Sequence, residues 1–427
     1  MYATMICRLC PFCTPRPSVV FHHFRRISLT SRKLRPLVLG IETSCDETGA
    51  AVVDNNGNVL GEGLYSQKNI HVRNGGIIPP LAQHLHRQHI DGVVQEALRT
   101  AGITIQDVSA VATTIMPGLA LCLTVGLEYS KELVRKAGLP FIPIHHMEAH
   151  ALTVRMIQQV HFPFLVLLVS GGHCILAVAR GVGDFLVLGN TVDDAPGEAF
   201  DKATRRLHLH HHPECSGLSG GQAIEKMAAK GTDRTLFHQK DVGGFKERDC
   251  NFSFAGIKQI LNQFITRQEV NEGIYDQQPP AFVSNLHDIA ASFQQRLTQQ
   301  ITLKLIRAFE YCRQTELITQ PQSALVVSGG VASNAYIRNA LDIVCARHNY
   351  KLVCPPPHLC TDNGIMIAWA GMERFKLGLG FAEDPQNVRF EPRFPLGEDI
   401  SEKVRDANIK VERIQFWKSE QTKKDRS

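Results

Sequence analysis

Three segments of the chain share one pattern: an unbroken run of apolar residues leads into a short turn of small and polar residues. A short run of this kind, bounded by turn residues, is typical of a buried β-strand. In the first two segments a second apolar run follows the turn, which predicts a pair of strands each time. These two segments lie about 130 residues apart, and the repetition predicts a duplicated β-sheet. The three segments are residues 37–54, 164–181 and 324–334.

Two amphipathic stretches lie between the apolar runs. Residues 86–102 place their apolar side chains on one face of a helix, and Gly102 is a typical helix stop. Residues 288–312 also carry apolar side chains at helical spacing, and we interpret both stripes as core-facing. Strands that alternate with helices in this way predict the α/β class. The first stripe consists of Ile90, Val93, Val94, Ala97 and Leu98, and the second of Ile289, Phe293, Leu297, Ile301, Leu305 and Phe309.

The composition is that of a soluble globular protein, with 44% hydrophobic and 20% charged residues in a chain of 427. That length is sufficient for two domains or one large two-lobed body. No apolar run approaches the roughly 20 residues that a membrane-spanning helix needs, so we predict no membrane insertion. The 12 cysteines are scattered, several of them within apolar runs, which favours a reducing compartment over a disulfide framework.

Basic residues are concentrated at the N-terminus. Residues 1–41 contain seven arginines and lysines and no acidic residue, and without them the net charge falls from +5 to −2. Such a segment is typical of a mitochondrial presequence, which we assign to residues 1–34; a disordered basic tail is the alternative. The remaining chain shows no bulk basic charge, so RNA contacts would have to come from short patches such as Arg205–Arg206 or Arg135–Lys136.

Two of the turns contain the sequence Ser-Gly-Gly. Ser170-Gly171-Gly172 and Ser328-Gly329-Gly330 each follow a strand of the buried type. Glycines let backbone N–H groups approach an anionic oxygen closely, and the serine hydroxyl adds another donor. One such turn is usually structural, but two turns after matching strands favour a nucleotide-binding site.

Four acidic residues surround the start of a predicted helix in residues 193–207. Asp193 and Asp194 lie where a carboxylate stabilises the N-terminus of that helix, and we interpret them as caps. Glu198 and Asp201 lie further into the helix. There the alternative to a structural role is an acceptor for ribose hydroxyls or a metal ligand.

The segment HHMEAH, residues 145–150, combines three histidines with a glutamate. His146 and His150 are one helical turn apart and share a face, so they can bind one metal ion. Glu148 points to the opposite side, whereas a zinc protease of the HExxH type needs its glutamate next to the first histidine. Two histidines leave a metal site incomplete. Asp362 is a candidate third ligand, and it could equally be the N-cap of the helix that follows it.

Five other histidines receive no metal-binding role. His145 precedes the pair and points elsewhere, so we treat it as structural. His208, His210, His211 and His212 lie in a segment that reads as a loop without regular geometry.

Nine motifs follow one another along the chain: GIETSCDETGAAVVD, GGIIPPLAQHLH, MPGLALCLTVGL, HHMEAHAL, LLVSGGHC, APGEAFDKATRRL, NFSFAGIK, VVSGGVASN and CTDNGIMIAW. In sequence and order they are similar to those of the tRNA threonylcarbamoyladenosine transferase family. The resemblance extends from Leu37 to about residue 400. Together with the presequence, the variants of several motifs resemble the animal mitochondrial branch.

This resemblance implies an actin/Hsp70/sugar-kinase-like fold, in which two RNase-H-like lobes enclose a nucleotide cleft. After residues 1–34, the chain would divide into an N-terminal lobe (35–150), a C-terminal lobe (151–400) and a polar tail (401–427). The implied reaction transfers a threonylcarbamoyl group from threonylcarbamoyl-AMP to the exocyclic nitrogen of the adenosine just 3′ of the anticodon in mitochondrial tRNA, and releases AMP. The implied location is the mitochondrial matrix.

The resemblance also implies roles for particular residues. One divalent metal ion per subunit, zinc or iron, would be held by His146, His150 and Asp362. Ser170 and Asp201 would support the reaction, which needs no protein nucleophile because the acyl phosphate is already activated. Where many family members have a Tyr-Pro-Gly-Gly turn, this chain reads HHHPECSGLSGG, so either Gly220 or Gly221 matches the ligand-contacting glycine. The implied substrate-binding residues are Leu168, Val169, Ser170, Gly171, Gly172, Asp201, Gly221, Glu225, Gly329 and Asn334.

The implied partners are mitochondrial tRNA and a separate synthase that supplies the adenylate; a homodimer is left open. Three other functions were weighed against the transferase. An actin/Hsp70-like ATPase or kinase shares the fold but needs magnesium-binding carboxylates rather than a His/His/Asp site. A metalloendopeptidase is disfavoured by the position of Glu148. A non-enzymatic RNA-binding module would not require the three metal ligands to converge.

Overall fold

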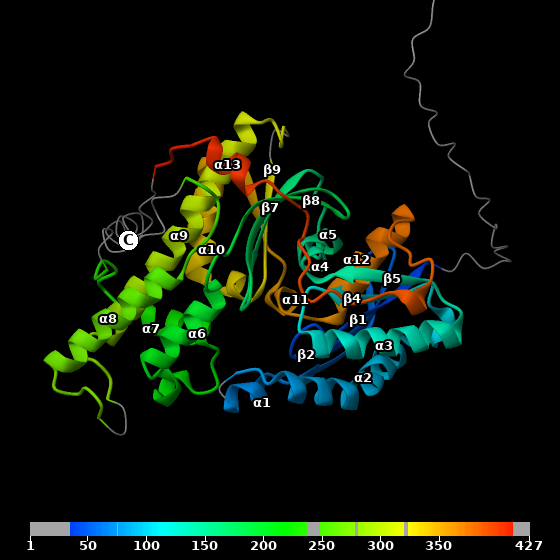
Figure 1. Cartoon of the computed structure of the whole chain (residues 1–427), viewed down its shortest axis with the longest axis horizontal. Coiled ribbons are helices and arrows are strands. Elements are labelled where there is room, and N and C mark those ends of the chain that lie inside the picture. Colours follow the sequence, from blue (N-terminus) through cyan, green and yellow to red (C-terminus); the bar gives the residue numbers. More distant parts are fainter. Residues whose placement is uncertain (1–34, 75, 238–247, 278–280, 320–322, 413–427) are drawn as a thin grey trace, which may run out of the picture. The chain divides into compact units, whose positions relative to one another are not determined.

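The computed structural model describes residues 35–74, 76–237, 248–277, 281–319 and 323–412 (Figure 1). The presequence assigned to residues 1–34 and the last part of the predicted polar tail, residues 413–427, lie outside the described residues.

The first apolar segment forms the centre of a five-stranded sheet. Strand β2 runs antiparallel to its neighbours β1 and β3, β4 lies parallel to β1 and β5 parallel to β4, in the order β3-β2-β1-β4-β5. β1 and β2 are buried along nearly their whole length, because helices cover both faces of this sheet. The strands are β1 (Leu37–Glu42), β2 (Glu47–Asp54), β3 (Val59–Ser66), β4 (Ala110–Met116) and β5 (Phe141–His145).

The second sheet repeats this arrangement strand by strand. β7 runs antiparallel to its neighbours β6 and β8, β9 lies parallel to β6 and β10 parallel to β9, so the order β8-β7-β6-β9-β10 matches that of the first sheet. A short strand β11 is added parallel to β8. The predicted duplication, and with it the α/β fold of two similar sheets, is confirmed. The strands are β6 (Phe164–Val169), β7 (Cys174–Gly181), β8 (Asp184–Asn190), β9 (Ser323–Ser328), β10 (Tyr350–Val353) and β11 (Glu398–Asp399).

Helices α2 and α3 cover one face of the first sheet, and α12 covers the other. The apolar face predicted for α2 is buried, and the helix ends where Gly102 adopts a left-handed φ of 67°. α12 approaches the strands closely: a Cβ atom on Gly40 of β1 would come within 2.1 Å of the backbone nitrogen of Ala368. The helices are α2 (Pro79–Ala101), α3 (Ala120–Ala137) and α12 (Gly364–Leu377).

The second sheet packs with one face into the largest core of the protein, which contains α6 to α10. The predicted apolar stripe of α9, from Ile289 to Phe309, is buried there. The other face of the sheet packs against Met147 and Ala151 of α4. The helices are α4 (His146–Leu152), α6 (Pro196–Arg206), α7 (Gly220–Ala228), α8 (Ala255–Asn271), α9 (Leu286–Gln314) and α10 (Ala335–Arg347).

Helices α4 and α12 each follow one sheet in the chain and pack against the other. α4 comes directly after β5 of the first sheet, yet it contributes to the core of the second. α12 comes after the last long strand of the second sheet, and so lies in the residues assigned to the second lobe, yet it packs on β1, β2 and β4. The two helices contact each other, and Figure 1 shows them side by side between the sheets. This crossing places the first turn of α4 next to the residues that precede α12.

The described residues also contain four short α-helices: α1 (Lys68–Arg73), α5 (Val154–Ile157), α11 (Pro357–Cys360) and α13 (Ser401–Asp406). α13 opens the predicted polar tail, and Val404 and Ile409 join the large core, so the described part of this tail is packed against the second sheet's helices. None of the helices in the described part of the chain combines the length and the apolar composition that crossing a membrane requires.

Candidate functional site

Three side chains meet where the start of α4 lies next to the start of α12. His146 and His150 lie one turn apart on α4, and Asp362 directly precedes the N-cap of α12. The Asp362 Oδ1 atom lies 3.1 Å from His150 Nε2 and 3.5 Å from His146 Nε2. The structure thus brings together the three residues that the sequence singles out as metal ligands. The N-cap alternative for Asp362 is excluded, because the side chain of Asn363 accepts the hydrogen bond from Met366 N.

The donor set of this triad fits a zinc or iron ion. Two imidazole nitrogens and one carboxylate oxygen lie within 4.8 Å of one another. Metal–ligand bonds of about 2.0–2.2 Å at a tetrahedral angle hold donor atoms roughly 3.3–3.5 Å apart, close to the 3.1 Å and 3.5 Å that separate Asp362 Oδ1 from the two histidine nitrogens. Both histidines are buried and Asp362 is half-buried, so the triad can be reached from the Asp362 side.

Glu42 and Ser44 hold the imidazole of His146 in its orientation. Glu42 Oε2 lies 3.2 Å from His146 Nδ1, and Ser44 Oγ lies 3.1 Å from the same atom. Glu42 is fully buried at the end of β1, where its carboxylate accepts hydrogen bonds of 2.5 Å from Thr114 Oγ1 and from the backbone N–H of Ser44. A His146 tautomer that donates Nδ1–H to Glu42 turns its Nε2 lone pair toward Asp362, as metal ligation requires.

Sequence reasoning did not identify Glu42 as part of the site. Its one local signal is an acidic residue at the end of an otherwise apolar strand. The contact with His146 joins positions 104 residues apart in the chain, so no local spacing predicts it.

The pKa values of His146 and Glu42 are set mainly by the opposite charges that face each other in this cluster. Burial alone would lower the pKa of His146, but the carboxylates of Asp362 and Glu42 outweigh it and raise that pKa to about 9. Burial acts to raise the pKa of Glu42, and the charge of His146 outweighs it, so this pKa is lowered. A metal ion would therefore have to displace a proton from His146.

The opposite face of α4 is structural. The Oε2 atom of Glu148 accepts a hydrogen bond of 2.6 Å from Arg374 Nη2 of α12, and its Oε1 accepts one of 2.8 Å from Gly183 N. His145 caps the helix, because its Nδ1 accepts a hydrogen bond of 3.1 Å from Met147 N. Glu148 therefore fastens α4 to α12 and is turned away from the triad, as its spacing predicts.

Ser170 and the two glycines after it form a tight turn between β6 and β7. The Ser170 N–H donates to His173 O at 2.9 Å, and its Oγ accepts from His173 N at 3.1 Å. Burial and then the charge of His146 lower the pKa of His173 to about 4, so this turn lies within electrostatic reach of the triad. Gly171 and Gly172 are exposed, and a Cβ atom on either would meet nothing within 4 Å. Such room is what an anionic oxygen needs to reach backbone N–H groups.

The second Ser-Gly-Gly turn, after β9, differs from the first. Gly329 has a φ of 101°, and a Cβ atom there would lie 2.4 Å from Val169 O, so the fold itself requires glycine. The hydroxyl of Ser328 is buried and has no hydrogen-bond partner among the described residues. The side chains of Leu168 and Val169 are buried in the cores on either side of β6, so their backbone atoms are the groups that can reach a ligand.

Asn334 and Glu225 meet at the start of α10. The Oδ1 atom of Asn334 caps this helix by accepting a hydrogen bond of 3.0 Å from Ile337 N. Its Nδ2 is buried and finds no acceptor in the described part of the chain, which leaves one donor for a ligand or a water molecule. Glu225 Oε1 accepts a hydrogen bond of 2.6 Å from Ala335 N, and this contact gives Glu225 a structural role at the same helix end.

Asp201 and the two glycines at the start of α7 lie together. A Cβ atom on Gly220 would come within 2.1 Å of Asp201 Oδ1, whereas one on Gly221 would meet open space. Gly220 is therefore needed for packing against the carboxylate, and Gly221 is the glycine with room for a ligand. This contrast favours the sequence-based choice of Gly221.

The interpretation of Asp193 and Asp194 as caps of α6 is wrong. Asp193 Oδ1 accepts a hydrogen bond of 2.7 Å from Phe254 N at the start of α8. Asp194 forms ion pairs with Lys202 Nζ at 2.7 Å and Lys258 Nζ at 2.5 Å. The cause is tertiary: α8 packs beside α6, and its first residues bind the carboxylates that the local pattern assigned to α6.

The histidine-rich loop is arranged differently from the triad. His210 and His211 lie within a 3₁₀ turn, Leu209–His211, and His208 and His212 flank it. Within the described ranges, His146, His150 and Asp362 are the one set of three His, Cys, Asp or Glu residues whose donor atoms lie this close together.

Comparison with known proteins gives consistent matches over most of the chain. A family model described as tRNA N6-adenosine threonylcarbamoyltransferase (TsaD) matches residues 58–369. A mouse protein named "tRNA N6-adenosine threonylcarbamoyltransferase, mitochondrial" is 52% identical over 404 residues, which cover 94% of this chain and 96% of the mouse protein. The human protein of that name is 52% identical over 383 residues, covering 90% and 91%. A Rhizobium leguminosarum tRNA N6-adenosine threonylcarbamoyltransferase is 40% identical over 364 residues, covering 84% and 94%.

Among solved structures, the chain superposes on the HypF protein of T. kodakarensis with a TM-score of 0.48 and 14% sequence identity, covering 80% of this chain and 48% of that one.

Proposed function

Because this chain belongs to the tRNA N6-adenosine threonylcarbamoyltransferase family, and is thus an acyltransferase, we propose the following reaction for it. It transfers the threonylcarbamoyl group from threonylcarbamoyl-AMP to N6 of the adenosine just 3′ of the anticodon in mitochondrial tRNA. The mouse and human relatives are named as mitochondrial enzymes, and we assign this chain to the same organelle, with the matrix as its compartment.

The proposed reaction needs positioning more than it needs a reactive side chain. The amino group attacks the carbonyl carbon of the mixed anhydride, a C–N bond forms, and the C–O bond to the phosphate breaks. AMP leaves with the bonding electron pair, and the amine loses a proton. Because the anhydride is already activated, the protein has to orient the two substrates and stabilise the charge that develops on the carbonyl oxygen and the leaving phosphate.

The convergence of His146, His150 and Asp362 is the observation that carries this proposal, and α4, which bears both histidines, also packs against β6, the strand that leads into the turn of residues 170–172. A zinc or iron ion held by the three residues would supply Lewis-acid polarisation of a substrate oxygen. Glu42 keeps His146 in the ligating orientation. The exposed backbone of Gly171 and Gly172 would hold the phosphate of the adenylate.

Residues around the second glycine turn would complete the adenylate site. The unpartnered Nδ2 of Asn334 offers a donor, and Gly221 leaves space for a ribose or a base. Asp201 is an acceptor for ribose hydroxyls. Ser170 supports the turn through its hydrogen bonds to His173. Supply of the adenylate by a separate synthase stays a prediction from the sequence, which leaves a homodimer open.

A transfer assay with the purified protein tests this function. The protein, starting near Leu37, is mixed with unmodified mitochondrial tRNA, threonylcarbamoyl-AMP and zinc or iron, and the nucleosides are then analysed by mass spectrometry. We expect the threonylcarbamoyl mass on adenosine, its loss in His150→Ala together with the bound metal, and retention of both in His161→Ala, which changes an exposed histidine. Folded, metal-loaded wild-type protein that leaves the tRNA unmodified would contradict the proposal.

A further inference from the structure

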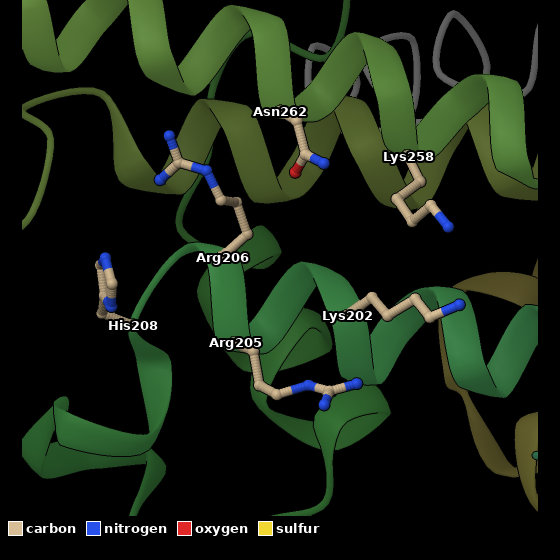
Figure 2. A pocket seen from close by; sticks show the side chains of 6 residues that line it. All are labelled: Lys202, Arg205, Arg206, His208, Lys258 and Asn262. Atoms are coloured by element: carbon tan, nitrogen blue, oxygen red, sulfur yellow. The ribbon is translucent and has the colours of Figure 1, made fainter.

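A basic hollow lies between α6 and α8, outside the candidate site. It is open to solvent and has a volume of about 460 Å³. Figure 2 shows Lys258 and Asn262 pointing from α8 toward α6, whose Lys202, Arg205 and Arg206 line the opposite wall. The lining consists of Lys202, Arg205, Arg206, His208, Lys258 and Asn262. None of these six side chains is acidic or aliphatic, so the hollow presents donors rather than an apolar surface.

Three of the four cations in the hollow are partly neutralised. Asp194 is shared between Lys202 and Lys258, at 2.7 Å and 2.5 Å, so one carboxylate faces two ammonium groups. Glu198 makes a further ion pair with Lys202 at 2.6 Å. Since Asp194 serves two cations, Lys258 keeps capacity for another anion.

The remaining two arginines differ from each other. Arg206 is bound on both sides of its guanidinium by Glu269, at 2.6 Å each, and this pair joins α6 to α8. Arg205 is exposed, and among the described residues its guanidinium makes no ion pair within 4 Å; Asp201 acts on it at longer range. Lys202, Lys258 and Arg206 thus form ion pairs with three carboxylates, and Arg205 is the cation of the hollow that has no such pair within 4 Å in the described part of the chain.

The hollow is connected to the candidate site by α6 itself. The first turn of α6 touches the turn of residues 170–172, where Gly197 N donates to Ser170 O at 3.2 Å. Arg205 lies eight residues further along the same helix, a rise of about 12 Å. A polynucleotide that presents one base near Ser170 can therefore place a neighbouring phosphate in the hollow.

We propose that this hollow binds a backbone phosphate of the substrate tRNA, with Arg205 and Lys258 as the contacting cations and Asn262 as an additional donor. The proposal rests on the function proposed above, because that function makes tRNA the substrate. Phosphate oxygens are the usual partners of exposed arginine and lysine side chains in such complexes, and these contacts position the RNA without reading its sequence. A site for stacked bases would need aromatic side chains, and of the six lining residues His208 alone carries a ring.

Direct binding measurements test the hollow independently of catalysis. Fluorescently labelled tRNA is titrated with the full-length protein and with Arg205→Ala, Lys258→Ala and the double variant, over a series of salt concentrations. The matched control is Arg267→Ala, an exposed arginine on α8 that lies half a turn around the helix from Lys258. We expect each single variant to weaken binding roughly five- to tenfold at 0.1 M salt and to reduce the slope of log K against log salt by about 1, and the control to change neither.

A second measurement separates a phosphate contact from a defect in the adenylate site. Steady-state transfer by Lys258→Ala should show a raised KM for tRNA with an unchanged KM for threonylcarbamoyl-AMP. The loss of binding should be equal for tRNAs with and without an adenosine at the target position, because a phosphate contact carries no sequence information. A larger loss of tRNA affinity in the double variant than in either single variant supports the same assignment.

The outcomes are distinguishable from failure of the proposed function. Unchanged affinity and salt slope in the double variant, or equal losses in Arg267→Ala, would overturn the tRNA site even if the wild-type protein modifies tRNA normally. Absence of any tRNA binding by the wild-type protein would overturn it as well. If the wild type binds tRNA but transfers nothing, reduced salt slopes in Arg205→Ala and Lys258→Ala would still support the hollow, while the proposed function would fail.

Discussion

The two sheets carry their first hairpin turns at equivalent positions, and these turns have opposite character. The turn after β1 is closed: Glu42, Thr43 and Ser44 are at most 2% exposed, and Glu42 holds His146 from inside the protein. The turn after β6 is open: Gly171 and Gly172 are exposed and have empty space where side chains would be. The two similar sheets thus carry turns with different roles. The turn after β1 supports a metal ligand, and the turn after β6 leaves its backbone accessible to a substrate.

Removal of a triad residue should have the largest effect on transfer. Asp362→Ala deletes one of three ligands and the carboxylate that faces both histidines. We expect loss of bound metal and a transfer rate lowered by about a thousandfold or more, since Lewis-acid stabilisation is worth several kcal/mol. Metal analysis and the nucleoside assay measure both quantities. Asp384→Ala, an exposed carboxylate elsewhere, is the control, and full metal content with normal transfer in Asp362→Ala would contradict the assignment.

Weakening of the closed turn should have the next largest effect. Glu42→Gln keeps the shape of the side chain but removes the charge that orients His146. Loss of such a supporting carboxylate typically lowers metal affinity by about 10- to 100-fold. A chelator titration measures the affinity, and transfer should recover at saturating metal, because Glu42 positions a ligand and does not touch the substrate. If the chelator midpoint matches that of Glu62→Gln, an exposed glutamate on β3, the closed turn has no such role.

Substitutions in the two Ser-Gly-Gly turns distinguish glycines that leave space for a ligand from glycines that the fold requires. Gly172→Ala should raise the KM for threonylcarbamoyl-AMP roughly tenfold, the equivalent of one lost charge-assisted hydrogen bond, and leave the unfolding free energy nearly unchanged. Gly329→Ala should lower the unfolding free energy by about 1–3 kcal/mol, because its φ of 101° is unfavourable for alanine. Urea unfolding and adenylate kinetics test the pair. Equal destabilisation by both variants would show that the first turn is also required for folding.

Much of the fold could be predicted from the sequence because burial leaves a local pattern. The apolar runs at residues 37–54 and 164–181 became the hairpins β1–β2 and β6–β7, and the stripe on α2 became the face that packs on the first sheet. Periodicity states which side chains are buried. It does not state against which partner they pack, and the crossing of α4 and α12 between the sheets depends on that choice.

Site residues could be predicted where their spacing within one helix determines their direction, and where their motifs match a known family. The spacing of His146 and His150 predicts a shared helix face, and the position of Glu148 predicts that it points away. The support from Glu42 and the ion pair of Asp194 with Lys258 had no local signal, because each joins segments that only the tertiary fold brings together. Carboxylates near a helix start were therefore assigned to the nearest N-terminus, and for Asp193 and Asp194 that was wrong.

Two buried glutamates near α4 provide the most discriminating test of the closed turn. Glu42 faces His146, whereas Glu148 faces Arg374 and Gly183 on the other side of the helix. Glu148→Gln should lower the unfolding free energy by about 1–3 kcal/mol, because a charge-assisted pair inside the protein is weakened. It should leave metal affinity and, below the unfolding temperature, the transfer rate nearly unchanged. Replacement of a glutamate by glutamine would then lower metal affinity at Glu42, on one side of α4, and lower the unfolding free energy at Glu148, on the other side. Loss of metal in Glu148→Gln at temperatures where the protein stays folded would show instead that the triad depends on the general packing of α4 against α12. The buried turn after β1 would then have no specific role in metal binding.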